Sequence, residues 1–275
     1  MRIFEKMKSK FKRRIKRFLI ALVVLYLAGG IALYFFQDKI LFHPKALATD
    51  HKFLFDQPFE ELNISFESET VSIVKFKPVG VRKGIVLLYH GNMGNVEHYK
   101  QYPGFFLRNN YEIWMIDYPG FGKTTGRQTE KNMDEEALLM YNMASKEINN
   151  DSIVIYGKSI GTGVAAYVAS NEKCSRLILE TPYYSVHSLA KSYFPMYPVL
   201  WMIRYSFPIH DYLKKINAPV TIFHGTEDEV IPYKHSKWLK EENKNVELIS
   251  IKNGKHNNLA TFSLFQQKID SLFRK

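Results

Sequence analysis

The chain has 275 residues, of which 46% are apolar and 24% charged. This composition excludes an intrinsically disordered protein and leaves room for one large domain with an appendage. The net charge of +11 is concentrated at the N-terminus, where nine Lys and Arg side chains against one Glu give residues 1–17 a charge of +8. The rest of the chain carries only +3, which removes the main argument for nucleic-acid binding.

Residues 18–36 follow this basic tail of residues 1–17 and contain no charged side chain. As a helix rising 1.5 Å per residue they would span about 28 Å, enough to cross the hydrocarbon core of a bilayer. The run is longer than the ~7–15-residue core of a cleaved signal peptide. The nearest Ala-x-Ala sequence, at 46–48, lies ten residues beyond its end. We therefore interpret residues 18–36 as an uncleaved transmembrane signal-anchor.

The charges on either side of this apolar run predict its orientation. Nine Lys and Arg residues precede it, whereas residues 37–53 contain only Lys39, Lys45 and Lys52. The positive-inside rule then predicts a cytoplasmic N-terminus and places the following domain on the other side, in the periplasm, the cell exterior or the lumen. Cys174 is the only cysteine, so no internal disulfide argues for or against an oxidising compartment.

After a connector at residues 37–58, residues 59–275 alternate between predicted strands and helices. Two alternating strands, 62–67 and 71–77, predict an antiparallel hairpin at a sheet edge. The following apolar strands and helical segments predict an α/β fold with a mostly parallel sheet covered on both faces. The strands are expected at 85–89, 111–116, 152–156, 176–180, 220–224 and 246–251, and the helices at 95–109, 132–149, 161–170, 233–243 and 258–273.

Residues 157–161 read Gly-Lys-Ser-Ile-Gly and connect a predicted strand to a predicted helix. In this context the pattern G-x-S-x-G is typical of the nucleophile elbow, in which the serine lies on a strained turn. Glycines two residues away on either side avoid the clash of a Cβ with the neighbouring strand or helix. Ser159 is therefore the candidate nucleophile. Lys158 is either a solvated charge or a group that favours anionic substrates.

The acid and the base that such a serine needs are expected further along the chain, in the order Asp, His. Asp228 lies in the polar turn after the fifth parallel strand, but its neighbours Glu227 and Glu229 fit equally well on spacing alone. Among nine histidines, His256 alone follows the last predicted strand. A serine hydroxyl is a weak nucleophile until such a base accepts its proton, and the acid holds the imidazole in the correct tautomer.

Two backbone N–H groups are candidates for an oxyanion hole. One is that of Ile160, directly after the serine, and the other is that of Asn92 in the glycine-rich turn of residues 90–95. His90 and His224 end predicted strands and are expected to brace loops by hydrogen bonding. The histidines show no metal-ligand spacing such as His-Glu-x-x-His, so no metal site is implied.

Taken together, the His-Gly-Asn sequence at 90–92, the Asp-Tyr-Pro-Gly-Phe-Gly sequence at 117–122 and the elbow resemble those of the α/β-hydrolases. The chain is most similar to their single-pass, membrane-anchored branch, and the resemblance covers residues 37–275. It selects Asp228 over the neighbouring glutamates. It implies a Ser159–His256–Asp228 triad that needs neither cofactor nor metal.

Residues 181–219 form a lid-like insertion, because α/β-hydrolases carry a lid at this position and the segment holds nine aromatic residues and five prolines. Phe194, Tyr197 and Trp201 are candidates to line an apolar mouth over the serine. The alternative is that these aromatic side chains pack a short helical excursion onto the sheet.

The sequence therefore predicts a membrane-anchored serine hydrolase that cleaves a small-molecule or lipid carboxylic ester through an acyl-enzyme on Ser159. An amidase, an aminopeptidase-like enzyme or a thioesterase would use the same triad. A protein with this fold and no activity, serving as a tethered binding or scaffold protein, is the remaining alternative.

Overall fold

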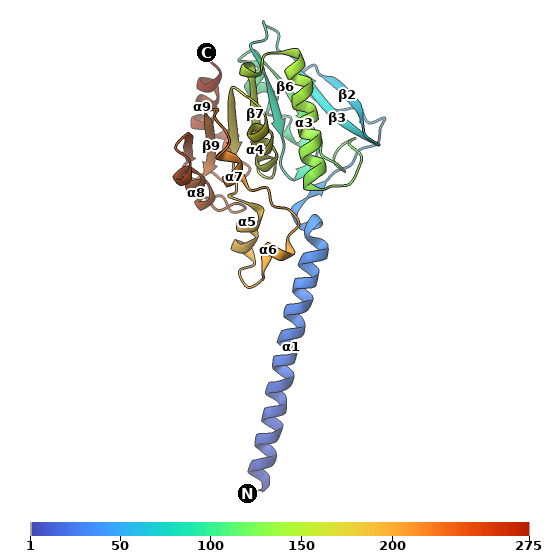
Figure 1. Ribbon diagram of the computed structural model, residues 1–275, viewed down its shortest axis with the longest axis vertical. Coiled ribbons are helices and arrows are strands. Elements are labelled where there is room, and N and C mark those ends of the chain that lie inside the picture. The colour runs from blue at the N-terminus through green and yellow to red at the C-terminus, as the bar shows by residue number, and fades with distance from the viewer. Residues whose placement is uncertain (1, 275) are drawn as a thin grey trace.

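A 40-residue helix, α1 (Arg2–Leu41), extends from one face of an α/β domain in the computed structural model, which describes residues 2–274 (Figure 1). By length and composition, α1 is the one helix among the described residues that could cross a membrane. The helix does not end at residue 36, so the first five residues of the predicted connector are helical. They remain helical because they pack on the domain, where Gln37 is buried and Leu41 contacts the core.

Eight strands form one sheet whose spatial order is β10-β9-β8-β7-β4-β6-β3-β2. All neighbours from β10 to β6 are parallel, whereas β3 is antiparallel to both β6 and β2. The predicted edge hairpin and parallel series are thus both present. The strands are β2 (Glu60–Phe66), β3 (Glu69–Phe76), β4 (Gly84–Tyr89), β6 (Tyr111–Ile116), β7 (Ile153–Lys158), β8 (Arg176–Glu180), β9 (Val220–Gly225) and β10 (Val246–Ile251).

The helices cover both faces of this sheet. One face is covered by α3 (Glu130–Glu147), α4 (Gly161–Asn171), α7 (Ile209–Leu213) and α8 (Lys234–Glu242), and the other by α2 (Pro103–Leu107) and α9 (Ser263–Phe273). The single helix predicted at 95–109 is instead a 3-10 helix, Val96–Tyr99, followed by α2, because Pro103 begins a new helix. Shorter elements are β1 (His43–Pro44), β5 (Met93–Gly94), α5 (Val186–Tyr193), α6 (Val199–Met202) and the 3-10 helices Asn150–Ser152 and Leu259–Thr261.

The central strands are buried on both faces, which explains why they read as unbroken apolar runs. In β7, Ile153 and Ile155 belong to the core under α3 and α4, whereas Val154 and Tyr156 belong to the core under α2 and α9. Alternate side chains of one strand therefore fill two separate cores. The carboxyl ends of these strands lie on the same edge of the sheet, and α1 leaves the domain on that side (Figure 1).

Asp134 on α3 gives the stability of the fold a pH dependence. Burial, followed by the nearby Glu130 and Glu135, raises the pKa of Asp134 to about 9. One of its carboxyl oxygens has no hydrogen-bond partner among the described residues. The folded state therefore keeps a proton that the unfolded chain releases above about pH 4. Because of this group, the free energy of unfolding falls as pH rises from about 4 toward 9, by up to ~1.4 kcal/mol per pH unit.

We expect Asp134→Asn to stabilise the protein more at pH 8 than at pH 5, by at least about 1 kcal/mol, since the amide has no proton to lose. The measurement is denaturant unfolding of the detergent-solubilised protein at several pH values. Glu241→Gln, an exposed carboxyl on α8, is the control and should leave the pH profile unchanged. Parallel profiles for Asp134→Asn and the wild type would contradict the assignment.

Candidate active site

Ser159 lies in the turn between β7 and α4 with a φ of 52°, in the left-handed region. Its backbone N–H donates to the carbonyl of Glu180 at 2.9 Å, which holds the turn against β8. The flanking glycines are required by close contacts. A Cβ on Gly157 would lie 2.5 Å from the carbonyl oxygen of Gly161, and one on Gly161 would lie 2.2 Å from that of Tyr89. The predicted elbow is present, and strain of this kind is typical of functional serines.

The structure brings the three predicted triad residues together although they are up to 97 positions apart in the chain. Nε2 of His256 lies 2.9 Å from Oγ of Ser159, and Nδ1 of the same ring lies 2.9 Å from a carboxylate oxygen of Asp228. All three side chains are buried. With its proton on Nδ1, the imidazole donates to Asp228 and presents Nε2 as the acceptor for the serine proton.

Asp228 alone among the three adjacent acids reaches His256, because Glu227 and Glu229 point to solvent. Its second carboxylate oxygen accepts backbone N–H groups of Val230 and Ile231 at 2.9 and 2.7 Å. Burial by itself would raise the pKa of Asp228. Hydrogen bonds from the two neighbouring histidines outweigh burial and hold that pKa well below its usual range. The carboxyl is therefore ionised at neutral pH.

His224 is the second histidine at this carboxylate. Its Nε2 lies 3.2 Å from Asp228 and 2.9 Å from the carbonyl of Ile231, and its Nδ1 lies 2.6 Å from the hydroxyl of Ser236. The ring is buried and ties the Asp228 loop to α8, which is the bracing role expected for it. His90 is also buried, 2.7 Å from the carbonyl of Gly91 and 3.2 Å from Asp117.

Asn92 and Ile160, whose backbone N–H groups are the candidate oxyanion donors, both line one apolar pocket. Within residues 2–274 neither backbone N–H donates a hydrogen bond. The Asn92 side-chain amide donates to the carbonyl of Leu41 at 2.8 Å, and the backbone carbonyl of Asn92 accepts from the N–H of His43 at 2.8 Å. The short parallel pair β1–β5 continues this contact. The end of α1 is thus attached directly to the candidate oxyanion loop.

Lys158 is neither solvated nor directed at a substrate. Its ammonium donates to the carboxylate of Glu180 at 2.6 Å and to the carbonyl of His256 at 3.3 Å, and both charged side chains are buried. The hydroxyls of Tyr102 and Tyr156 also donate to Glu180. This network lies beneath the triad and fixes the loop that carries His256. The sequence analysis did not predict this network. The available signal was Glu180, an acidic residue at the end of an apolar strand.

The apolar pocket beside the elbow has a volume of about 270 Å³, near the lower end of the range for small-molecule sites. Its far wall consists of Leu189, Ala190, Tyr193 and Phe194 from α5 and the residue that follows it, so Phe194 lies where it was predicted. Tyr197 and Trp201 do not line the pocket, and this part of the prediction needs correction. Tyr197 stacks on Tyr26 of α1, and Trp201 is 88% exposed.

The prediction missed the contribution of α1 to this pocket. Leu33, Gln37, Ile40 and Leu41 of this helix also line the pocket. An all-apolar helix gives no sequence signal for the face that contacts a domain, but Gly29 and Gly30 mark the side on which another segment approaches closely. Of the lid-like insertion, Tyr183, α5 with Phe194, and Ile203 line the pocket, whereas Ile209 and Leu213 of α7 belong to the core.

Comparisons with known proteins identify the superfamily of the chain. Residues 80–209 match the family described as serine aminopeptidase, S33. Alpha/beta hydrolase domain-containing protein 17B from Homo sapiens is 32% identical over 193 residues, covering 68% of this chain and 65% of the relative. Protein 17C from Xenopus tropicalis is 31% identical over 188 residues, covering 67% and 59%. The chain thus matches slightly less than two thirds of the length of these relatives.

Solved structures share the fold at low identity. An esterase from Pyrococcus furiosus has a TM-score of 0.62 at 18% identity, covering 85% of this chain and 97% of that one. Est1E from Butyrivibrio proteoclasticus has a TM-score of 0.64 at 17% identity, covering 77% and 96%. The chain belongs to the α/β-hydrolase superfamily. In this α/β-hydrolase the family match contains Ser159 but ends before Asp228 and His256, whose positions rest on the geometry above.

The geometry predicts which carboxylate supports the base. Asp228→Asn should lower the rate at which a fluorophosphonate labels Ser159 by about 10²–10⁴-fold, since an amide cannot stabilise the imidazolium. Glu227→Gln and Glu229→Gln are matched controls on either side and should label at the wild-type rate. Circular dichroism checks that each variant is folded. A larger loss for Glu227→Gln than for Asp228→Asn would show that the wrong carboxylate has been assigned.

Proposed function

We propose that this protein is a membrane-anchored serine hydrolase that cleaves a carboxylic ester with an apolar acyl group. The observation that carries the proposal is the continuous hydrogen-bond chain Ser159–His256–Asp228 beside a pocket with an apolar lining. Membership of the α/β-hydrolase superfamily supports hydrolysis as the reaction class. An inactive scaffold is disfavoured, because it has no need to keep a strained serine turn and a buried, hydrogen-bonded triad together.

In the proposed reaction Oγ of Ser159 attacks the ester carbonyl carbon while Nε2 of His256 takes the hydroxyl proton. The carbonyl oxygen becomes an oxyanion, which the N–H groups of Asn92 and Ile160 would stabilise; one such donor is worth about 3–4 kcal/mol. Collapse breaks the bond to the alkoxide, which leaves as the alcohol with the proton from His256. Water then attacks the acyl-enzyme with His256 as the base and releases the carboxylic acid.

The pocket lining favours an ester over a peptide with a free amino terminus. An aminopeptidase needs a negative or strongly accepting group for the substrate ammonium, and burial of an unpaired charge is costly. No charged side chain lines this pocket among the residues that the structure describes. A thioester would fit the same apolar wall and the same triad. It remains the alternative substrate class.

We also propose that α1 anchors the protein, with residues 18–36 in the bilayer, a cytoplasmic N-terminus and the domain on the other side. The exposed apolar surface of the helix supports this proposal, because none of its most apolar window is buried. The nine basic residues before the span support the orientation.

Ser159→Ala should abolish fluorophosphonate labelling and lower hydrolysis of p-nitrophenyl esters by more than about 10³-fold, since the triad acts as a unit. Esters from acetate to decanoate are compared, and the wild type should favour the longer chains because each buried methylene contributes about 0.8 kcal/mol. Ser170→Ala, at the far end of the helix that follows the elbow, is the control and should keep full activity. Undiminished turnover by Ser159→Ala would refute the mechanism. A wild-type preference for aminoacyl amides would refute the ester assignment.

The topology is tested with a reporter enzyme that is active only outside the cytoplasm, fused after the last residue. We expect it to be active, and we expect neutral replacements of the basic residues in 1–17 to reduce that activity, because they remove the charge bias. The same number of neutral replacements on the domain surface serves as the control. An inactive fusion whose domain is folded and accessible from the cytoplasm would reverse the proposed orientation.

A further inference from the structure

The stretch of residues 192–203, which we name the lid tip, contains no charged side chain and exposes several of its large apolar ones. Met196 is 70%, Leu200 71% and Trp201 88% exposed. Charged residues resume directly on both sides, at Lys191 and Arg204. A continuous apolar surface of this kind marks an interaction site on a soluble domain.

The lid tip is docked on the apolar part of α1. The rings of Tyr197 and Tyr26 stack with centroids 4.7 Å apart, the Tyr197 hydroxyl donates to the carbonyl of Tyr26, and the Tyr26 hydroxyl donates to that of Met196. Gly29 leaves the space that this contact requires, because a Cβ there would lie 2.3 Å from the Tyr197 hydroxyl. Figure 1 shows α5 and α6 below the rest of the domain, beside the upper part of α1.

A second set of contacts marks the polar end of this docking. One terminal nitrogen of the Arg204 guanidinium donates to both carboxylate oxygens of Asp38, each at 2.8 Å. The Gln37 side chain bonds the backbone of Met202 and Arg204 at 3.2 and 2.7 Å. Tyr26 precedes Asp38 by twelve residues, which is about 18 Å along a helix and more than half of a ~30 Å hydrocarbon core.

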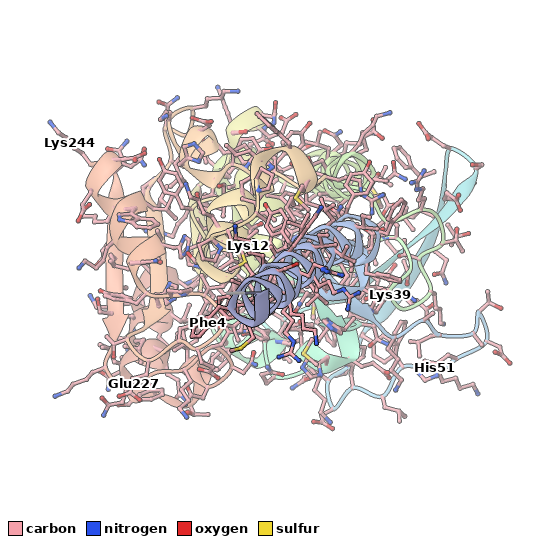
Figure 2. All side chains as sticks on the ribbon, turned by 90° about the horizontal axis from the view of Figure 1, so that it is seen from below. Phe4, Lys12, Lys39, His51, Glu227 and Lys244 are labelled. Atoms are coloured by element: carbon pink, nitrogen blue, oxygen red, sulfur yellow. The ribbon has the colours of Figure 1, made fainter. Side chains whose placement is uncertain are left out.

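The depth of these contacts determines what surrounds the lid tip. If residues 18–36 cross the bilayer, a segment in contact with Tyr26 lies beside the hydrocarbon of the leaflet on the domain side. If water surrounded the lid tip instead, Met196, Leu200 and Trp201 would be exposed to solvent at a depth where the residues of α1 contact lipid. Viewed along α1, the helix leaves from within the outline of the domain and not from its rim, so the underside of the domain faces the membrane around it (Figure 2).

We infer that the lid tip is inserted in this leaflet and that the pocket opens sideways into it, between α1 and α5. The inference rests on the anchoring part of the proposed function. The pocket runs from Leu33, inside the apolar span, to Ile160 beside the nucleophile. Its walls, α1 and α5, are the two elements that continue into the membrane. The substrate is therefore a lipid ester that stays in the leaflet and presents its ester group at the surface.

The insertion is tested by tryptophan fluorescence of the full chain in vesicles of phosphatidylcholine, part of it brominated on the acyl chains. Bromine quenches tryptophan on contact, so Trp201 should be quenched by the brominated lipid and protected from aqueous iodide. Trp201→Phe should remove most of the lipid quenching. Trp238→Phe, a partly exposed tryptophan on α8, should leave it unchanged.

These results separate the inference from the function it rests on, because the measurement needs no catalysis. Quenching of Trp201 by iodide and not by brominated lipid, in a protein that is firmly bound to vesicles, would overturn the insertion and leave the anchor intact. A protein that does not bind vesicles would overturn both.

Sideways entry is tested by narrowing the pocket within the leaflet. Leu33→Trp should lower the ratio of hydrolysis of a vesicle-embedded monoacylglycerol to that of soluble p-nitrophenyl acetate by about tenfold or more, since the larger side chain fills the part of the pocket nearest the leaflet. Leu25→Trp, at an exposed position of the same helix that does not line the pocket, should leave the ratio unchanged. An unchanged ratio for Leu33→Trp would overturn sideways entry. A wild type that hydrolyses neither ester would refute the proposed function, whereas the fluorescence result would still stand.

Discussion

The left-handed turn at Ser159 is the constraint on which the rest of the site depends. β4, β7 and α4 approach this turn so closely that residues 157 and 161, two positions away on either side, must be glycine. A parallel sheet supplies this approach, since its central strands are buried on both faces and their carboxyl ends lie at one edge. The loops after β9 and β10 end at the same edge. They bring Asp228 and His256 to Ser159, although the three residues lie far apart in the sequence.

Buried charges around the turn are all paired, and each pair fixes a loop. Asp228 is held by two histidines and two backbone N–H groups, and Lys158 is held by Glu180 and the carbonyl of His256. Such pairs add little net stability when compared with apolar residues of equal volume, but losing one partner is costly. Their contribution is geometric, because they hold the imidazole of His256 in a single position between Ser159 and Asp228.

The sequence predicted the fold and the chain order Ser, Asp, His of the candidate triad, because the elbow is a local motif and the three positions each follow a strand of the sheet. It could not separate Asp228 from Glu227 and Glu229 by spacing, since only the backbone path of the loop decides which carboxylate points inward. It was wrong about Tyr197 and Trp201, because aromatic content does not say which way a side chain faces. The role of α1 in the pocket was missed for a similar reason: a uniformly apolar helix has no periodicity from which a contact face can be read.

The unbroken course of α1 through Leu41 has a mechanical consequence. A domain on a flexible linker samples a wide range of heights and tilts above a membrane, and its reach grows with the length of the linker. Here α1 continues into the domain without a flexible linker and is fixed to it by the Asp38–Arg204 ion pair and by a hydrogen bond from the Asn92 side chain. If α1 is anchored as we propose, Ser159 stays at one height and one angle. The search of the proposed enzyme for substrate is then two-dimensional, carried out by diffusion of the whole molecule in the plane of the membrane.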